Sequence, residues 1–401
     1  NFAFYRKKIK GERVSFLELL SSSQHGLFKL KARHSLSQYL KKLSKYRLDY
    51  MHNGKVEQPA INWVLSFFVP LLATGGPGAS RVILLSSCIY FLGANNTASF
   101  GSDFFILMLL NIMFSQSFGF FILKKEHSNS FPTVVQQSLL GLGTSLVVLI
   151  SLYFFEVISN LNYSIPLLVI LHFYYLFRFK RIAKQGFFIL ACAECLISVV
   201  CLLFPIIFNQ ILMSNFNAPY IIYLIATFSG LFLVYSFDEK NVNYALQLKI
   251  PIQKVVNIAV STSASVFALF CFPFVAKLVL DPKIASYVAL TISCFSIAML
   301  IPRTQANKYL SKLGSDELSK ESLNKINRGY SVLILNSCVV SLIFTACYLK
   351  LLSLSWGVAV SIPAIITLLF LSSQHGFIYL TTLSLRGKDA VVAKLNLAVL
   401  F

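Results

Sequence analysis

Acidic residues are scarce in this chain, and charged residues of either sign are few. Its 401 residues include 15 Asp and Glu, and all charged side chains make up 12% of the sequence, against 56% hydrophobic residues. A soluble globule needs more polar side chains than this to cover its surface. The composition therefore excludes an ordinary soluble domain and predicts helices within a lipid bilayer.

The sequence motifs of several enzyme classes are also missing. The chain has no Asp-x-Asp, no Walker phosphate-binding loop, no Gly-x-Ser-x-Gly, and no His, Asp or Glu at the spacing of metal ligands. We therefore expect a protein that is not an enzyme, needs no cofactor and has no metal site.

Cysteines are present, but only within apolar stretches. There a thiol behaves as a small hydrophobic side chain, so the eight cysteines do not indicate a disulfide framework. Cys192 and Cys195 have redox-pair spacing, but a membrane helix lacks the thioredoxin-like context that such a pair requires.

What the chain does have is a net charge of +20, distributed unevenly. From Arg81 onward, about ten apolar stretches follow one another, and the connections after every second stretch hold 18 Lys and Arg. The alternate connections hold only Lys277, Lys283 and Lys350. Because cations beside membrane spans stay in the cytoplasm, this predicts a multi-pass inner-membrane protein with its even-numbered connections inside. Contact with anionic membrane lipids explains the charge without a nucleic-acid partner.

The hydropathy pattern divides the chain into four predicted parts. These are a basic cytoplasmic segment at 1–58, an N-lobe of spans one to six at 59–237, a cytoplasmic linker helix at 238–254, and a C-lobe at 255–401. Spans seven and eight repeat the plan of spans one and two, which predicts an all-α transmembrane bundle of two pseudo-repeated six-helix lobes. The chain lacks an initial Met and ends as an eleventh span begins near 395, so we expect a fragment with a truncated second lobe.

The first apolar stretch is too long for one span. We expect its helix to break at Gly75-Gly-Pro-Gly-Ala-Ser80, with a half-inserted piece before the break and span one, at 81–95, after it. Arg81 would then lie in the first turn of a new helix, where free N–H groups, the helix dipole and a guanidinium favour a phosphate. The alternative is an interfacial Arg that anchors the helix at the lipid head groups.

Ionisable residues within predicted spans are candidates for function, because they are costly in a bilayer. Glu194, seven residues into span five, is either protonated and hydrogen-bonded at a helix contact or a proton or cation site facing an aqueous cavity. His172, midway along span four, has the same two interpretations. Since the two spans are consecutive, the two side chains could approach each other.

Other polar and aromatic residues have less specific interpretations. We expect Asp103 and Glu156 near the membrane interface, and Tyr174, Tyr175 and Phe177 in an interfacial aromatic belt. Polar stripes in spans two and seven either line a cavity or join helices; they comprise Asn111, Gln116 and Ser117, and Ser261 to Ser265.

Three further segments carry a resemblance to a known family. They are Phe91-Leu-Gly-Ala94 and Phe100-Gly101 with Phe118-Gly119 and Lys124-Lys-Glu126; Leu300-Ile-Pro302 with Ala306-Asn-Lys-Tyr-Leu310; and Leu385-Arg-Gly-Lys-Asp389. Over residues 60–401 the chain resembles the polysaccharide flippases of the multidrug/oligosaccharidyl-lipid/polysaccharide exporter superfamily, the O-antigen and capsule translocases. The basic segment 1–58 departs from the short N-terminus usual in that family.

The resemblance implies a transporter in the bacterial inner membrane. Its substrate would be an undecaprenyl-diphosphate-linked oligosaccharide, turned to the outer leaflet by alternating access, and its partners would include membrane lipids and the polysaccharide polymerase machinery. Substrate-binding candidates are Arg81, His172 and Lys277, and the candidate for ion coupling is Glu194. Two alternatives stay open: an O-antigen polymerase or ligase, which would be expected to have a large external loop, and a cation-coupled exporter of small molecules.

Overall fold

The computed structural model describes residues 59–123, 131–184, 186–207, 217–236, 251–298, 300–302, 319–352, 354–374 and 377–400, with side chains from Phe68 onward. The chain divides into two units, Asn1–Phe67 and Phe68–Phe401, and the second is described here by itself. The predicted basic segment 1–58 and residues 238–250 of the predicted linker lie outside the described residues.

The described residues form helices and short connections, without a β-strand. The helices are α3 (Pro59–Leu92), α4 (Ala94–Leu110), the π-helix η1 (Asn111–Gln116), α5 (Ser117–Leu123), α6 (Phe131–Phe154), α7 (Leu161–Ala183), α8 (Phe187–Ile207), α10 (Ala218–Ser236), α11 (Ile252–Val279), α12 (Pro282–Ala298), α14 (Lys320–Leu351), α15 (Trp356–Gln374), α16 (Phe377–Leu385) and α17 (Asp389–Leu400).

Nine segments within the described residues are long and apolar enough to cross a membrane. They confirm the predicted all-α, multi-span membrane protein. The fourth predicted span, which corresponds to α7, is not among the nine, although α7 buries many of its side chains inside the bundle. The pseudo-repeat of two lobes stays a prediction, and we use "first half" for α3–α10 and "second half" for α11–α17 by chain order alone.

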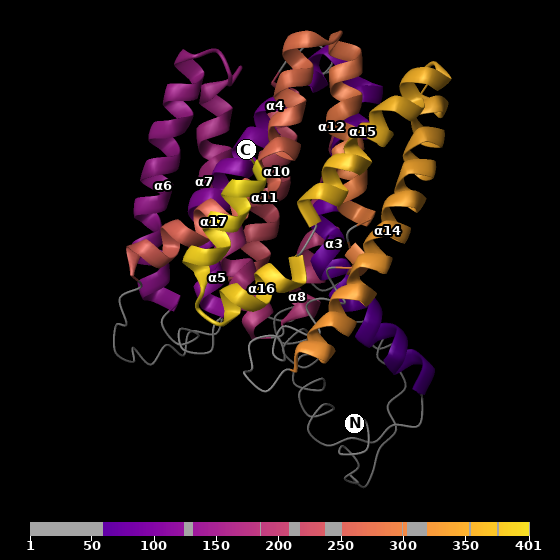
Figure 1. The fold of residues 1–401 in the computed structure, drawn as a ribbon. Helices are drawn as coiled ribbons and strands as arrows, with labels where there is room; N and C mark the ends of the chain where they lie inside the picture. Colours follow the sequence, from indigo (N-terminus) through magenta and orange to yellow (C-terminus); the bar gives the residue numbers. More distant parts are fainter. Residues whose placement is uncertain are drawn as a thin grey trace, which may run out of the picture. The chain divides into compact units, whose positions relative to one another are not determined.

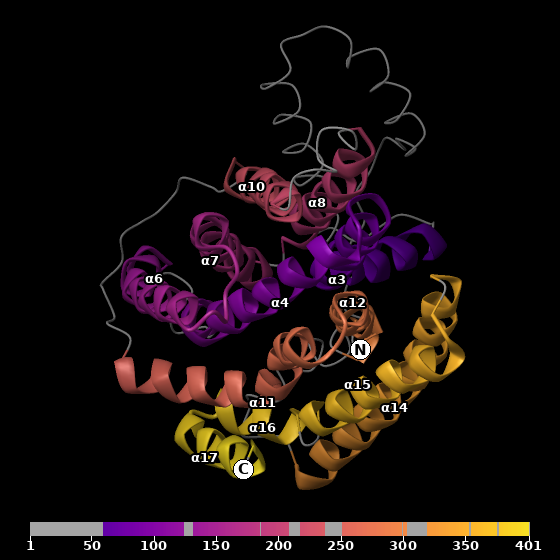
Figure 2. The ribbon, with the colours of Figure 1, turned by 90° about the horizontal axis from the view of Figure 1, so that it is seen from above.

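Helices α3 and α4 form the side of the first half that faces the second half. In Figure 2, with the helix labels and colours of Figure 1, α6, α7, α8 and α10 lie on one side of α3 and α4, and α11, α12, α14 and α15 lie on the other. Helix α4 packs extensively on both α11 and α12, whereas α7 and α8 pack mainly on α10. The buried core includes Phe104, Phe105 and Leu107 of α4. The contact between the halves is therefore built largely on α4.

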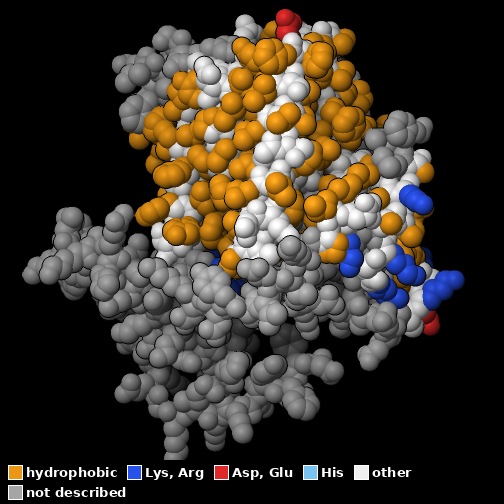
Figure 3. Space-filling view, turned by 90° about the vertical axis from the view of Figure 1, so that its left-hand side faces the viewer, with side chains coloured by type: hydrophobic (Ala, Val, Ile, Leu, Met, Phe, Trp, Pro, Cys, Tyr) orange, Lys and Arg blue, Asp and Glu red, His pale blue; other side chains and the backbone are white. Residues whose placement is uncertain are grey.

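The outer surface is apolar along the helices and basic toward one end. Figure 3 shows hydrophobic side chains covering most of one face, with Lys and Arg gathered at its lower end. Exposed aliphatic and aromatic residues include Leu140, Phe344 and Leu368. Such a surface fits lipid rather than water, and the basic end agrees with the uneven distribution of cations in the sequence.

The predicted break in the first stretch is wrong, because α3 continues through the Gly-Pro run from Pro59 to Leu92. Pro77 lies inside the helix, as does Pro70. Prolines are tolerated inside membrane helices when neighbouring groups satisfy the backbone carbonyls that they leave without a donor. The neighbouring group at Pro77 belongs to the site described below.

A second irregular segment is η1, which interrupts the helix between α4 and α5. The hydroxyl of Ser117 donates to the carbonyls of Ile112 (3.1 Å) and Met113 (2.8 Å), two backbone acceptors inside this widened turn. On the facing helix α6, a Cβ at Gly141 would lie 2.6 Å from the carbonyl oxygen of Phe114. Only a glycine at this position leaves space for the π-helix against α6.

Candidate functional site

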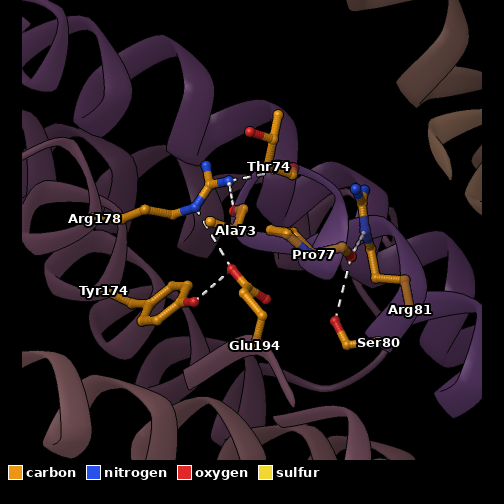
Figure 4. A network of polar contacts seen from close by, with 8 residues as sticks. All are labelled: Ala73, Thr74, Pro77, Ser80, Arg81, Tyr174, Arg178 and Glu194. Carbon is orange, nitrogen blue, oxygen red and sulfur yellow. Dashed lines mark hydrogen bonds and ion pairs between the residues drawn. The ribbon is translucent and has the colours of Figure 1, made fainter. Parts of the chain in front are cut away.

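The candidate site begins at the proline in the middle of α3. Pro77 has no N–H and therefore cannot donate to the carbonyl of Ala73 four residues earlier. Arg178, on α7, supplies a donor instead: its Nη2 lies 2.8 Å from the oxygen of Ala73 and 3.3 Å from that of Thr74 (Figure 4). A side chain from another helix thus satisfies the carbonyl that would otherwise mark a break in α3.

The same guanidinium faces the buried carboxylate of Glu194 on α8. Arg178 Nε lies 3.5 Å from Glu194 Oε1, and Tyr174 OH donates to that oxygen at 2.6 Å. The Glu194 side chain is 2% exposed and that of Arg178 is 13% exposed. Glu194 Oε2 has no hydrogen-bond partner among the described residues. One carboxylate oxygen therefore has two partners, while the other is buried without one.

Gly76 makes this arrangement possible. A Cβ at Gly76 would lie 2.2 Å from the Cβ of Glu194, which is closer than two carbon atoms can approach. Gly76 therefore lets α8 pack against α3, and the Gly-Pro run does not end a helix as had been predicted.

Arg81 lies on the opposite side of Pro77 from Arg178 in Figure 4. Its Nε donates to the carbonyl of Pro77 at 2.6 Å, and the side chain is buried, with 9% exposure. Because α3 runs on from Pro59 to Leu92, Arg81 lies within the helix and not, as had been expected, in the first turn of a new one.

The site has more cations than anions. Arg178 and Arg81 are both close enough to Glu194 for a coulombic interaction, and arginine stays protonated in proteins. With Glu194 ionised, two guanidinium groups lie near one carboxylate, and that of Arg178 faces it directly. Within a membrane, an excess positive charge is costly unless an anion compensates it. The arrangement is therefore suited to an anionic ligand.

His172 belongs to a different cluster. The ring is fully buried, with Nδ1 2.5 Å from Ser115 Oγ of η1 and Nε2 3.0 Å from Ser138 Oγ of α6. The Ser138 hydroxyl donates to the carbonyl of Val135 and thus accepts from Nε2–H; in a neutral imidazole Nδ1 then accepts from Ser115. The imidazole joins η1, α6 and α7. No hydrogen bond or ion pair links it to Glu194 among the described residues, so their expected approach is not observed.

Lys277 and Asp103 form a third cluster, at the other end of the bundle. Asp103 is fully buried at this end of the bundle, and its expected place near the membrane interface stays a prediction. It accepts hydrogen bonds from Ser159 N (2.8 Å), Ser159 Oγ (3.2 Å), Asn160 N (3.2 Å) and Tyr220 OH (2.6 Å). Lys277 Nζ lies 4.0 Å from Asp103 Oδ1 and 2.5 Å from Ser159 Oγ. Glu156, in contrast, is exposed.

The aromatic belt predicted on α7 is wrong in part. Because Tyr174 was assigned to this belt, its role as a site residue was missed. Tyr174 and Tyr175 are 3% and 6% exposed, and Tyr174 is the hydrogen-bond donor to Glu194. Tyr174 and Arg178 are four residues apart, a spacing that places both on one face of α7. That spacing was a signal in the sequence for a shared partner. Arg178 was used only as one of the 18 cations that predict the orientation of the spans.

One of the polar stripes joins helices. Asn396 Nδ2 of α17 donates to the Ser261 carbonyl of α11 at 2.8 Å and to Ser261 Oγ at 3.0 Å. In the other stripe, Asn111 is fully buried, and neither of its amide atoms has a hydrogen-bond partner among the described residues.

Comparison with known proteins does not assign the chain to a family. No protein-family model, no curated protein and no solved structure matches it.

Proposed function

We propose that this multi-span membrane protein is a transporter, and that it moves an undecaprenyl-diphosphate-linked oligosaccharide from the inner to the outer leaflet of a bacterial inner membrane. The observation that carries the proposal is the buried cluster of Arg178, Arg81 and Glu194, in which cations exceed anions. The resemblance of its sequence segments to polysaccharide flippases supports the same substrate.

A diphosphate fits this cluster chemically. Guanidinium groups bind phosphate oxygens through two parallel N–H donors, and in a low-dielectric site each such hydrogen bond is stronger than in water. Arg178 already uses Nη2 on α3 and directs Nε toward Glu194. A diphosphate that approaches this guanidinium competes directly with Glu194.

Glu194 supplies a means of coupling in this proposal. When an anionic substrate takes over Arg178, the carboxylate loses its cationic partner inside the membrane and takes up a proton, because a neutral acid is less costly there. When the substrate leaves, Glu194 pairs with Arg178 again and releases the proton. The site thus alternates between two states. In one it holds the substrate, with a proton on Glu194, and in the other Glu194 forms an ion pair with Arg178.

The competing candidates lack a comparable observation. A polymerase or ligase of lipid-linked glycans needs groups that act on a glycosidic bond, and the buried acid found here is paired with Arg178. A cation-coupled exporter of small cations would favour excess acid, whereas this cluster has excess base.

The test is an analysis of lipid-linked oligosaccharides in a deletion strain, with and without the gene on a plasmid. Loss of a flippase leaves the undecaprenyl-diphosphate-linked oligosaccharide on the inner leaflet, where a lectin added to spheroplasts does not bind it. Loss of a polymerase or ligase leaves it on the outer leaflet, where the lectin binds. Accumulation that the lectin detects, or no accumulation, contradicts the proposal.

A further inference from the structure

The cluster around Asp103 is built mainly from the first half of the chain. Asp103 belongs to α4, Tyr220 to α10, and Ser159 and Asn160 to the connection between α6 and α7. Asn160 Nδ2 also donates to Asn217 Oδ1 beside α10. Three helical segments of the first half are therefore joined around one buried carboxylate.

Lys277 is the one member of this cluster from the second half. It lies in the last turn of α11, and its ammonium group contacts both Asp103 and Ser159. Asp103 keeps four other hydrogen-bond donors if Lys277 leaves. Losing the lysine therefore does not leave the carboxylate without hydrogen bonds, which makes the contact suited to repeated breaking and forming.

The surroundings of Lys277 also allow movement. Its side chain is 23% exposed, so water reaches the ammonium group while Asp103 stays buried. One turn earlier, Pro273 lies inside α11, and because it has no N–H the helix lacks a hydrogen bond at that point. The end of α11 that carries Lys277 is thus joined to the rest of the helix at a natural bending point.

We propose that the contact of Lys277 with Asp103 and Ser159 is a latch, which holds the two halves together at the end of the bundle opposite the basic end. When the latch opens, the end of α11 moves away from α4 and this end of the bundle separates. The proposal rests on the proposed transport function in that an alternating-access transporter must open at each end in turn. It gives Lys277 a role other than the substrate contact expected from the sequence.

The test measures the distance between the halves in the purified protein. Spin labels are attached at Asn162→Cys on α7 and Lys283→Cys on α12, two exposed positions at this end, after replacement of the eight native cysteines. Double electron–electron resonance then gives the distance distribution in the otherwise unchanged protein and in Lys277→Met, which keeps a similar length and loses the charge. The matched control is Lys350→Met, because the hydrogen bond and the cation–π contact of Lys350 within the described residues, with Leu354 and Trp356, stay in its own half.

The latch predicts that Lys277→Met raises the share of longer distances about fivefold, the change expected when a partly exposed ion pair of roughly 1 kcal/mol is lost. Lys350→Met should leave the distribution unchanged. Raising the salt concentration should also lengthen the distances, though less than the substitution does, in the protein with Lys277 but not in Lys277→Met, since salt screens a pair whose ammonium group is partly exposed. The salt series tests the latch even if the variant folds poorly.

Unchanged distances in both the Lys277→Met sample and the salt series overturn the latch, as does equal lengthening in Lys350→Met. The lipid analysis is independent of this measurement. If Lys277→Met lengthens the distances as expected but the deletion strain accumulates no lipid-linked oligosaccharide, the latch is supported and the proposed substrate is contradicted.

Discussion

Arg178 has two partners of different kinds, a backbone and a carboxylate. Its Nη2 completes the hydrogen bonding of α3 at Pro77, while its Nε faces Glu194. A lysine has one compact ammonium group and lacks the planar guanidinium whose donors point in fixed directions, so it cannot contact both the Ala73 carbonyl and Glu194 in this way. Arg178 therefore links the stability of α3 to the charge state of the site.

We expect Arg178→Lys to lower both stability and transport. Leaving the Ala73 carbonyl without a donor costs about 1–3 kcal/mol, so thermal unfolding in detergent should begin at a lower temperature. Arg81→Lys is the matched variant, because Arg81 donates to the carbonyl of Pro77 in its own helix and the substitution keeps the charge. Equal melting temperatures for both variants and the unchanged protein would show that Arg178 does not support α3.

Glu194→Gln separates proton coupling from packing. The amide keeps the size of the side chain and an oxygen that accepts from Tyr174, but it cannot titrate. We expect the variant to fold and to lose transport driven by a proton gradient, measured as flipping of lipid-linked oligosaccharide in proteoliposomes. The gradient is imposed in the direction of flipping, since in the proposed cycle substrate and proton enter and leave the site together. Glu156→Gln, at an exposed acid, should behave as the unchanged protein. Full gradient-driven flipping by Glu194→Gln would assign Glu194 to structure alone.

Among the helices, the π-helix η1 and its neighbour α6 show how one irregular element depends on another. The carbonyl of Phe114 approaches α6 at Gly141, where a Cβ would lie 2.6 Å away. Two residues later, a Cβ at Gly143 would meet no atom within 4 Å. One helix thus contains a glycine that the packing requires and another that it does not.

Gly141→Ala should destabilise the protein by roughly 1–3 kcal/mol, the usual cost of forcing an extra carbon into a packed contact. Gly143→Ala should be neutral or slightly stabilising, because alanine favours a helix over glycine by about 1 kcal/mol. Melting curves of the two purified variants decide between these outcomes. A Gly141→Ala variant as stable as Gly143→Ala would mean that η1 does not need its close approach to α6.

At the scale of the whole molecule, the topology depends on whether α7 crosses the membrane. Reporter fusions after Glu156 and after Lys184 lie on either side of α7, and we expect the first to report the external side and the second the cytoplasm. Fusions after Asn217 and Ser355 should report the external side, and one after Lys254 the cytoplasm. The same location for the Glu156 and Lys184 fusions would show that α7 does not cross.

Much of this bundle was predictable from the sequence, because apolar runs of spanning length and the distribution of cations reflect the bilayer itself. Spans four and five, predicted around His172 and Glu194, correspond to α7 and α8. The course of α3 was not predictable, since it depends on Arg178 about a hundred residues away. For the same reason the partners of Asp103 were not predictable: the hydropathy of its own span says nothing of the donors that Ser159 and Tyr220 bring to it.

The hydrogen bond that Arg178 donates to the Ala73 carbonyl of α3 also limits how tightly the site can bind a ligand. Any anion that draws Arg178 away from Ala73 returns that carbonyl to an unsatisfied state, and a cost of about 1–3 kcal/mol weakens binding by a factor of about 5 to 150. Such weakening shortens the residence time of the ligand rather than slowing its arrival. The dependence of α3 on Arg178 therefore favours release of a bound ligand over its retention, which suits a transporter that must release its substrate.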